Sequence, residues 1–414
     1  ALSLHNCLLA LVLAGSLAVF AGAFTGDRRV AMLVPWMVLL SGGLGFMMFG
    51  DDCGWNLSRA WHMLGHLPNN YTIRNDDYRW ANAINGLLMP QRSFLLGLPL
   101  LLWTVFLLWR QAPGWASGLW GGALCLAHTY CFLMVVGSAA ALTMLFPGRD
   151  WKRFWIVLAA VSLPGVLWLA SAVHASRFFA FNPGWDHGFT DPLTFWLKNA
   201  GLFLPLLVWS WRRADRTRLR FYAPFGAWFV LANLFQMAPW LWDNIKILFP
   251  WFLLSAPWVA ERVVRLRLPW AVLCTVLLCL SGTMDVWRIV SHAGELRLFT
   301  GADVAYARAV SGIVNGHPQS VVLHAPTLNS PLLLTGTLAV VGDPRHMKSH
   351  GIDAGNRAQQ IADYYRGEDT LPVPIQYIAV TPQERRLYSI APQRFAHCIT
   401  WMSTTEYAFY QIPP

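Results

Sequence analysis

The sequence has little charge. Only 13% of its 414 residues are Asp, Glu, Lys or Arg, whereas soluble globular domains have about a quarter. In contrast, 56% of the residues are hydrophobic and 23 are Trp. This composition excludes an ordinary soluble protein and indicates a chain whose main solvent is the lipid bilayer.

The sequence also lacks the local patterns of several functional classes. Its seven cysteines have no metal-ligand spacing, and no internal repeat is evident. There is no P-loop, dinucleotide fingerprint or ordered nucleophile triad. The formal net charge of +10 comes without the basic and aromatic groove pattern of nucleic-acid-binding proteins. We therefore expect no nucleic-acid partner and predict no metal-ligating residues.

Basic residues form five short clusters between long apolar runs. Because basic loops stay on the cytoplasmic side, the chain is expected to cross the membrane twice between neighbouring clusters. The first run and both termini are then outside, in an integral protein of the bacterial inner membrane. Since an outside start at Ala1 without a signal peptide is unusual, we expect that helices precede this chain. The clusters contain fourteen of the 31 Lys and Arg residues and are Arg28–Arg29, Arg110, Arg149–Arg153, Arg212–Arg220 and Arg262–Arg267.

The apolar runs predict a mainly α, polytopic transmembrane helix bundle. The ten runs predict about ten spans. Since several runs are shorter than the usual span of roughly 20 residues, some of these spans are expected to be short or broken. The runs are 7–24, 30–49, 93–109, 116–128, 130–146, 154–173, 194–211, 221–235, 247–259 and 269–287.

Two domains are expected. Residues 1–288 form the transmembrane domain, with a long outer loop at 50–92. Residues 289–414 have the composition of a soluble protein and predict a small extracytoplasmic α/β domain. Strand-like runs at 320–324, 338–341, 376–380 and 407–412 alternate there with helical patterns at 302–314 and 353–366.

The strongest local signal is the polar and aromatic connector 236–246 between two short apolar segments. Short segments broken by proline often mark backbone buried around a polar cavity. Asp243 is then a catalytic candidate, and Asn244 and Lys246 are candidates for binding a lipid phosphate. The alternative is an interfacial belt, in which Lys246 extends to the headgroups and Asp243 caps the next helix.

Three more residues are candidates for binding a lipid phosphate. Lys198 is about one turn inside the outer end of its predicted helix, where it needs a counter-charge or extends to the surface. Arg92 precedes an outer helix, an unfavourable place for a cation that a phosphate or a carboxylate would relieve. His128 is at the turn between two short helices, and the alternative is a neutral turn histidine.

Asp52 is the second catalytic candidate. With Asp51 it forms a carboxylate doublet at the end of the second helix. The alternative is a solvated helix exit.

In the soluble domain, four polar residues are candidates because of their places beside strands and helices. His324 and Asn329 follow a predicted strand, and His350 and Asp353 precede a predicted helix. Turn and N-cap roles are the alternatives for Asn329 and Asp353.

Four short motifs carry a resemblance to a known superfamily. They are Ser41–Phe46 (SGGLGF), Pro90–Arg92 with Leu95–Leu98 (LLGL), Trp242–Lys246 (WDNIK) and Ser349–Asp353 (SHGID). Together they resemble large bacterial membrane proteins related to the GT-C glycosyltransferases, and the similarity covers most of the chain.

That resemblance implies transfer of a sugar from a polyprenyl-phosphate-linked donor at the outer face, by an inverting displacement. A carboxylate positions the acceptor hydroxyl, and cationic residues or a divalent cation (Mg or Mn) stabilise the departing phosphate. The GT-C catalytic carboxylate lies in the first outer loop, for which this chain has no counterpart. The alternatives are a transporter or flippase for a lipid, or a non-catalytic subunit that assembles with a membrane partner.

Overall fold

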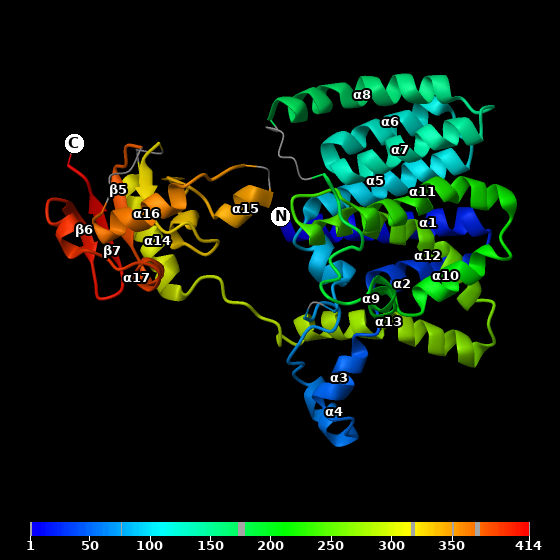
Figure 1. The fold of residues 1–414 in the computed structure, drawn as a ribbon, viewed down its shortest axis with the longest axis horizontal. Helices are drawn as coiled ribbons and strands as arrows, with labels where there is room; N and C mark the ends of the chain where they lie inside the picture. The colour runs from blue at the N-terminus through cyan, green and yellow to red at the C-terminus, as the bar shows by residue number, and fades with distance from the viewer. Residues whose placement is uncertain are drawn as a thin grey trace. The chain divides into compact units, whose positions relative to one another are not determined.

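The computed structural model describes residues 2–75, 77–172, 179–315, 319–349, 352–368 and 373–413. The chain divides into two compact units (Figure 1). The first is helical and extends to Glu295, and the second is formed by Leu296–Pro414.

The first unit is a helix bundle with fewer clear spans than expected. Four described helices are long and apolar enough to cross a membrane, or five if the pair α9 and α10, bent by 97°, counts as one broken span. The expected count of about ten is therefore not confirmed, because several apolar runs form short helices. The helices are α1 (Leu2–Thr25), α2 (Arg28–Leu39), α3 (Phe46–Asp52), α4 (Leu57–Leu64), η1 (Ala83–Leu88), α5 (Arg92–Trp109), α6 (Gly114–Ala127), α7 (Thr129–Leu145), α8 (Trp151–Ala172), α9 (Pro192–Ala200), α10 (Phe203–Trp211), α11 (Arg216–Leu234), η2 (Leu241–Asn244), α12 (Ile245–Val263) and α13 (Leu268–Val290).

Helix α12 is the centre of the bundle. All of its residues except Lys246 are buried, as expected for a helix that is apolar on every side. It packs against α1, α2, α7, α10, α11 and α13. Its first residues are therefore held by the surrounding helices, which fixes the position of Lys246.

Helix α8 packs closely on α6 through a glycine stripe. A Cβ atom at Gly114, Gly118 or Gly122 would lie 2.0, 2.5 or 2.7 Å from an atom of α8 or of the residue before it. Small residues at this four-residue spacing let two membrane helices approach closely. The outer face of α8 remains apolar and exposed, for example at Leu163 and Trp168.

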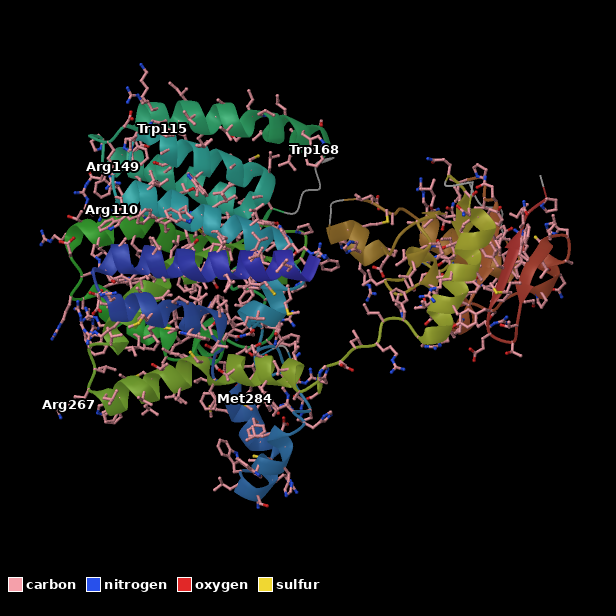
Figure 2. The ribbon with its side chains drawn as sticks, turned by 180° about the vertical axis from the view of Figure 1, so that it is seen from behind. Arg110, Trp115, Arg149, Trp168, Arg267 and Met284 are labelled. Carbon is pink, nitrogen blue, oxygen red and sulfur yellow. The ribbon has the colours of Figure 1, made fainter. Side chains whose placement is uncertain are left out.

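All five basic clusters lie at one end of this bundle, which we call the basic end. Arg110, Arg149 and Arg267 are together at that end in Figure 2, whereas Trp168 and Met284 lie toward the other. The spacing of the clusters therefore correctly predicts that the chain returns to one end between them. The side of the membrane that this end faces stays a prediction.

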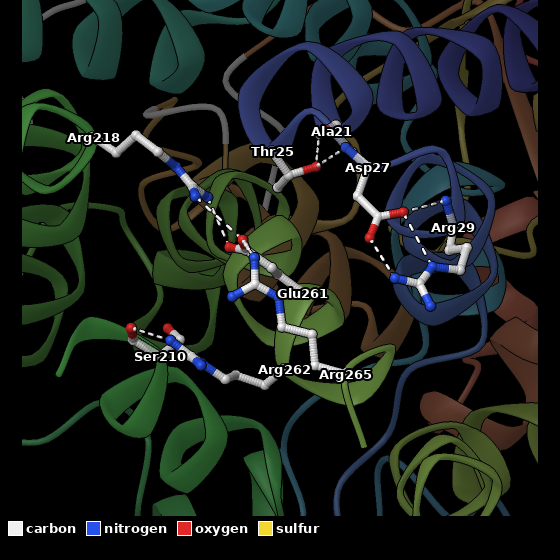
Figure 3. A network of polar contacts seen from close by, with 9 residues as sticks. All are labelled: Ala21, Thr25, Asp27, Arg29, Ser210, Arg218, Glu261, Arg262 and Arg265. Atoms are coloured by element: carbon white, nitrogen blue, oxygen red, sulfur yellow. Dashed lines mark hydrogen bonds and ion pairs between the residues drawn. The ribbon is translucent and has the colours of Figure 1, made fainter. Parts of the chain in front are cut away.

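Ion pairs of the buried Glu261 carboxylate connect two of the clusters at the basic end (Figure 3). Glu261 on α12 accepts two hydrogen bonds from Arg218 on α11, at 2.9 and 3.3 Å, and also pairs with Arg265. Arg262 donates to the Ser210 carbonyl at the end of α10. The Glu261 carboxylate thus links α11 to the end of α12, and Arg262 links the end of α12 to that of α10.

The end of the bundle away from the basic clusters, called here the opposite end, contains the SGGLGF motif. A Cβ atom at Gly43 would lie 2.0 Å from the Lys198 carbonyl oxygen, and one at Gly45 would lie 1.6 Å from that of Tyr71. The Leu44 N–H donates to the same Lys198 carbonyl at 2.7 Å. Glycine is needed here because backbone packs directly on backbone.

The second unit is an α/β domain with a five-stranded sheet in the order β4-β3-β5-β7-β6. Strands β4, β3 and β5 are parallel, whereas β7 and β6 are antiparallel. Side chains of α14 pack on one set of strand residues and those of α16 on another. The elements are α14 (Gly301–Val314), β3 (Val321–Leu323), η3 (Pro331–Leu334), β4 (Leu338–Ala339), α15 (Pro344–Ser349), α16 (Arg357–Arg366), β5 (Tyr377–Val380), α17 (Pro382–Leu387), η4 (Pro392–Phe395), β6 (Ile399–Ser403) and β7 (Ala408–Gln411).

One prediction for this unit was wrong in detail, and one strand was missed. Helix α16 begins at Arg357 rather than at Asp353, because Asp353 accepts the Gly355 N–H in a turn and Gly355 has a positive φ of 56°. Strand β6 was not predicted. It lies at the edge of the sheet and its residues are mostly exposed, so it lacks the apolar pattern of a buried strand.

Candidate functional site

The connector between α11 and α12 places an ion pair at the opposite end of the bundle. Nζ of Lys246 lies 3.0 Å from Oδ2 of Asp243, and the two side chains are 21% and 11% exposed. Oδ1 of Asp243 has no hydrogen-bond partner in the described parts of the chain. The pair is largely shielded from water and keeps one free carboxylate oxygen.

The turn between α6 and α7 borders this ion pair. Lys246 Nζ lies 5.9 Å from the ring centre of Tyr130, within the range of a cation–π interaction. His128 is within electrostatic range of Lys246. Nδ1 of His128 accepts the Cys131 N–H at 3.2 Å, as the N-cap of α7. The neutral imidazole therefore carries its hydrogen on Nε2.

The start of α5 joins the same cluster through His128. The rings of Phe94 and His128 are 4.3 Å apart, and Gly97 leaves room because its Cβ would lie 2.3 Å from that of His128. Arg92, the first residue of α5, is exposed, and its side chain makes no hydrogen bond or ion pair with any described residue. The counter-charge expected for it is not supplied by the described chain.

The Asn244 side chain holds the connector in place through three hydrogen bonds. Its Oδ1 accepts the Met237 N–H at 2.9 Å, and its Nδ2 donates to the carbonyls of Ala232 and Phe235 at 2.9 and 2.7 Å. The side chain is buried. These three bonds occupy most of the amide's capacity and hold η2 against the end of α11.

Lys198 has a protein counter-charge. It is in the last turn of α9, and its Nζ lies 2.9 Å from Oδ2 of Asp77. A hydrogen bond from Thr190 is the largest factor that lowers the pKa of Asp77, and the Lys198 contact is the next. Both side chains of the ion pair are about one-third exposed, at 32% and 40%, so a ligand can still reach Lys198.

Buried Asn199 connects this pair to the connector. Its Oδ1 accepts the N–H groups of Arg79 and Trp80 at 2.6 and 2.9 Å, and its Nδ2 donates to the Asp77 carbonyl at 2.7 Å. The Trp242 indole N–H in turn donates to the Arg79 carbonyl at 3.1 Å. One continuous set of hydrogen bonds therefore joins the long loop, α9 and η2 at the opposite end.

Asp52 is already fully engaged. It accepts two hydrogen bonds of 2.7 Å from Arg74, one of 2.9 Å from the Tyr71 hydroxyl and one of 3.1 Å from Asn69. The Arg74 guanidinium is the main reason that the pKa of Asp52 is lowered. A carboxylate held in this way is a weak base, and its described contacts give it a role in ordering the long loop.

Asp285 on α13 anchors the next part of that loop. It is buried and accepts the N–H groups of Tyr71 and Thr72 at 2.5 and 3.0 Å, and the Thr72 hydroxyl at 2.5 Å.

Four residues that organise the opposite end were not singled out as candidates from the sequence: Tyr130, Asp77, Asn199 and Asp285. A lone carboxylate inside an apolar run could have indicated Asp285, whereas no local pattern marks the other three.

The candidates of the second unit do not form a shared cluster. His324 is buried at the end of β3 and its Nδ1 bonds the Ala325 carbonyl at 2.8 Å. Burial lowers the pKa of His324. Asn329 and Asp353 are exposed, and Asp353 caps its own turn. His350 lies outside the described residues.

Possible metal ligands are scattered. Within the described ranges, no three His, Cys, Asp or Glu side chains are grouped so that they could hold a metal ion.

No family model matches this chain, and no curated protein matches it. Among solved structures, the crystal structure of ArnT from Cupriavidus metallidurans in the apo state is similar at a TM-score of 0.48 and 11% sequence identity. The likeness covers 99% of this chain and 84% of that one.

Proposed function

We propose that this chain is a membrane glycosyltransferase of the GT-C type. It transfers a sugar from a polyprenyl-phosphate-linked donor to an acceptor at the opposite end of the bundle, which faces the outside of the bacterial inner membrane. The observation that carries this proposal is the shielded Asp243–Lys246 pair beside His128 and Tyr130. An ionisable pair at the end of apolar helices suits a substrate with a lipid tail and a phosphate.

Lys246 is the counter-charge for the donor phosphate. Its ammonium group acts as a compact point charge, and α12 holds its backbone among the other helices. His128 adds a neutral N–H donor on Nε2 from the neighbouring turn. As the bond between the sugar and the phosphate breaks, negative charge grows on the phosphate oxygen, and fixed donors of this kind stabilise it.

Asp243 positions the acceptor. Its free Oδ1 accepts a hydrogen bond from the acceptor hydroxyl while Oδ2 stays with Lys246. The hydroxyl oxygen attacks the anomeric carbon, and the carbon–oxygen bond to the phosphate breaks with its electron pair leaving on the phosphate. The hydroxyl proton passes to Asp243. One displacement inverts the configuration of the anomeric carbon.

The other polar groups at this end have supporting roles in the proposal. Lys198 and Arg92 attract the anionic donor, since Lys198 is partly exposed and Arg92 has no described counter-charge. Asp52 orders the long loop. A divalent cation would add a further counter-ion for the phosphate beside Lys246, Lys198 and Arg92.

The experiment separates binding from chemistry. Wild-type protein, Lys246→Gln and Asp243→Asn are reconstituted in vesicles, and sugar transfer from a polyprenyl-phosphate donor is followed at several donor concentrations. Lys246→Gln is expected to raise KM for the donor and also to lower kcat, whereas Asp243→Asn lowers mainly kcat. Arg29→Gln, at the exposed edge of the basic end, is the control with unchanged kinetics. Wild-type kinetics in both site variants would refute the assignment.

A further inference from the structure

An open cavity of about 350 Å³ lies at the basic end, between the start of α6 and the start of α8. None of the residues of the proposed transfer site line it. Its walls include Gln111 and Gly148 from the two turns, and Arg149, Arg153 and Ser117. Two of these groups, the Arg149 guanidinium and the Ser117 hydroxyl, lack a partner that an anion would supply.

Arg149 is a half-buried cation without an acidic partner. Its guanidinium donates to the Leu108 carbonyl and lies 4.6 and 5.5 Å from the ring centres of Phe146 and Phe221. It forms no ion pair with a described carboxylate. Burial lowers the pKa of Arg149, because its charge is partly removed from water and no carboxylate faces it.

Ser117 adds a buried hydroxyl that has no partner. Its side chain is 1% exposed, and its Oγ makes no hydrogen bond. Helical serines usually satisfy this group by bonding a carbonyl one turn earlier. Ser117 is one of the residues that line the cavity, so rotation of its side chain would let the hydroxyl reach a ligand there and complete its hydrogen bonding.

The starts of two helices border the same cavity. Gly114 begins α6 and Trp151 begins α8, and residues of both starts line the cavity. Their first backbone N–H groups are already bonded, since Asp150 accepts the Gly114 N–H at 3.1 Å and the Arg149 carbonyl accepts the Trp151 N–H at 2.8 Å. Asp150 also lies 3.6 Å from Arg153. With two arginines and one aspartate, the lining keeps a net positive charge.

We propose that this cavity binds a phosphate group, held by Arg149, Arg153 and the Ser117 hydroxyl at the starts of α6 and α8. The phosphate is that of an anionic phospholipid headgroup or a soluble phosphate. Exposed apolar residues on α6 and α8, such as Leu119, Trp120 and Ile156, continue away from the cavity along the membrane-facing surface. A phospholipid would lay its acyl chains there.

Thermal unfolding of the full chain in a neutral detergent tests the site. Three additions are compared: phosphatidylglycerol, phosphatidylcholine and inorganic phosphate. The first is expected to raise the Tm of the wild-type protein by several degrees, and the second to have little effect. A comparable rise with inorganic phosphate alone identifies a soluble phosphate as a sufficient ligand, and no rise with it identifies the lipid headgroup.

The variants distinguish this site from general charge attraction. Arg149→Gln is expected to abolish the rise, and Arg153→Gln and Ser117→Ala to reduce it. Ser117→Ala is informative even if Arg149→Gln folds poorly, because the Ser117 hydroxyl makes no hydrogen bond that the folded chain would lose. Lys152→Gln removes an equal charge from the next position, outside the cavity lining, and should keep the full rise. Equal effects of Lys152→Gln and Arg153→Gln together with no effect of Ser117→Ala, or no rise with either phosphate source, would overturn the proposal.

Discussion

Nζ of Lys246 and Oδ2 of Asp243 are 3.0 Å apart across the junction of η2 and α12. The two residues belong to the same turn, so their distance is fixed locally, whereas the groups around them come from other parts of the chain. Tyr130 and His128 reach them from the α6–α7 turn. The polar centre therefore depends on the packing of α12 in the middle of the bundle as well as on its own sequence.

The junction around the SGGLGF motif is expected to tolerate no side chain at Gly43. In Gly43→Ala the new Cβ would lie 2.0 Å from a backbone carbonyl oxygen, so the backbone must move, at a cost of about 1–3 kcal/mol. Thermal unfolding in detergent measures this loss. Gly15→Ala is the control, because no atom lies within 4 Å of a Cβ there and alanine favours a helix by about 0.5–1 kcal/mol. Equal stability of the two variants would contradict the packing described here.

The Asp52–Arg74 pair is expected to order the long loop. Asp52→Asn replaces two charge-assisted hydrogen bonds of 2.7 Å with weaker ones and should cost about 1.5–3 kcal/mol. Limited proteolysis within residues 53–75 should become faster. Asp51→Asn is the matched control, since Asp51 accepts a hydrogen bond from Trp55 at an exposed position. The same proteolysis rate in both variants would show that the pair does not hold the loop.

The second unit is expected to lose stability in weak acid because of His324. Its pKa in the folded chain is below the ordinary value of 6.5, chiefly through burial. The unfolded chain therefore binds a proton first, and the free energy of unfolding falls as the pH decreases from 6.5 toward the folded pKa. Well above pH 6.5 His324 is neutral in both the folded and the unfolded chain, so it no longer lowers the free energy of unfolding.

Urea unfolding of the full chain at pH 8, 6.5 and 5, followed by hydrogen exchange of β3 and β5, tests this effect. His324→Gln should make the stability of these strands depend less on pH over that range, even if the variant is less stable overall. An unchanged pH dependence in the variant would assign the effect to other groups.

The parts of the fold that could be predicted have local signals. The basic clusters correctly predicted which turns of the bundle share an end, since each cluster is visible by itself. The polar connector also indicated Asp243 and Lys246 as candidates; the two side chains, three residues apart, form an ion pair, and their role in a site stays a prediction. The contacts that organise the opposite end have no such signal: Lys198 and Asp77 are 121 residues apart, and Asp285 and Thr72 are 213 residues apart.

Two of the predicted site residues illustrate the same distinction. Asn244 and Asp52 have the right chemistry for ligands, but in the folded chain long-loop and connector groups occupy their hydrogen-bonding capacity. Sequence reasoning can show that a polar residue lies at an end of the bundle. It cannot show whether a distant segment already satisfies that residue.

The most direct test of the central claim is the initial rate of sugar transfer by the double variant Asp243→Asn/Lys246→Gln in vesicles, with a polyprenyl-phosphate donor. The double variant removes both charges, so neither is left unpaired in a shielded position, and the folded fraction is checked by thermal unfolding. We predict a rate at least about 100-fold below that of the wild-type protein. A folded double variant that transfers sugar at the wild-type rate would contradict the assignment of this ion pair to the reaction.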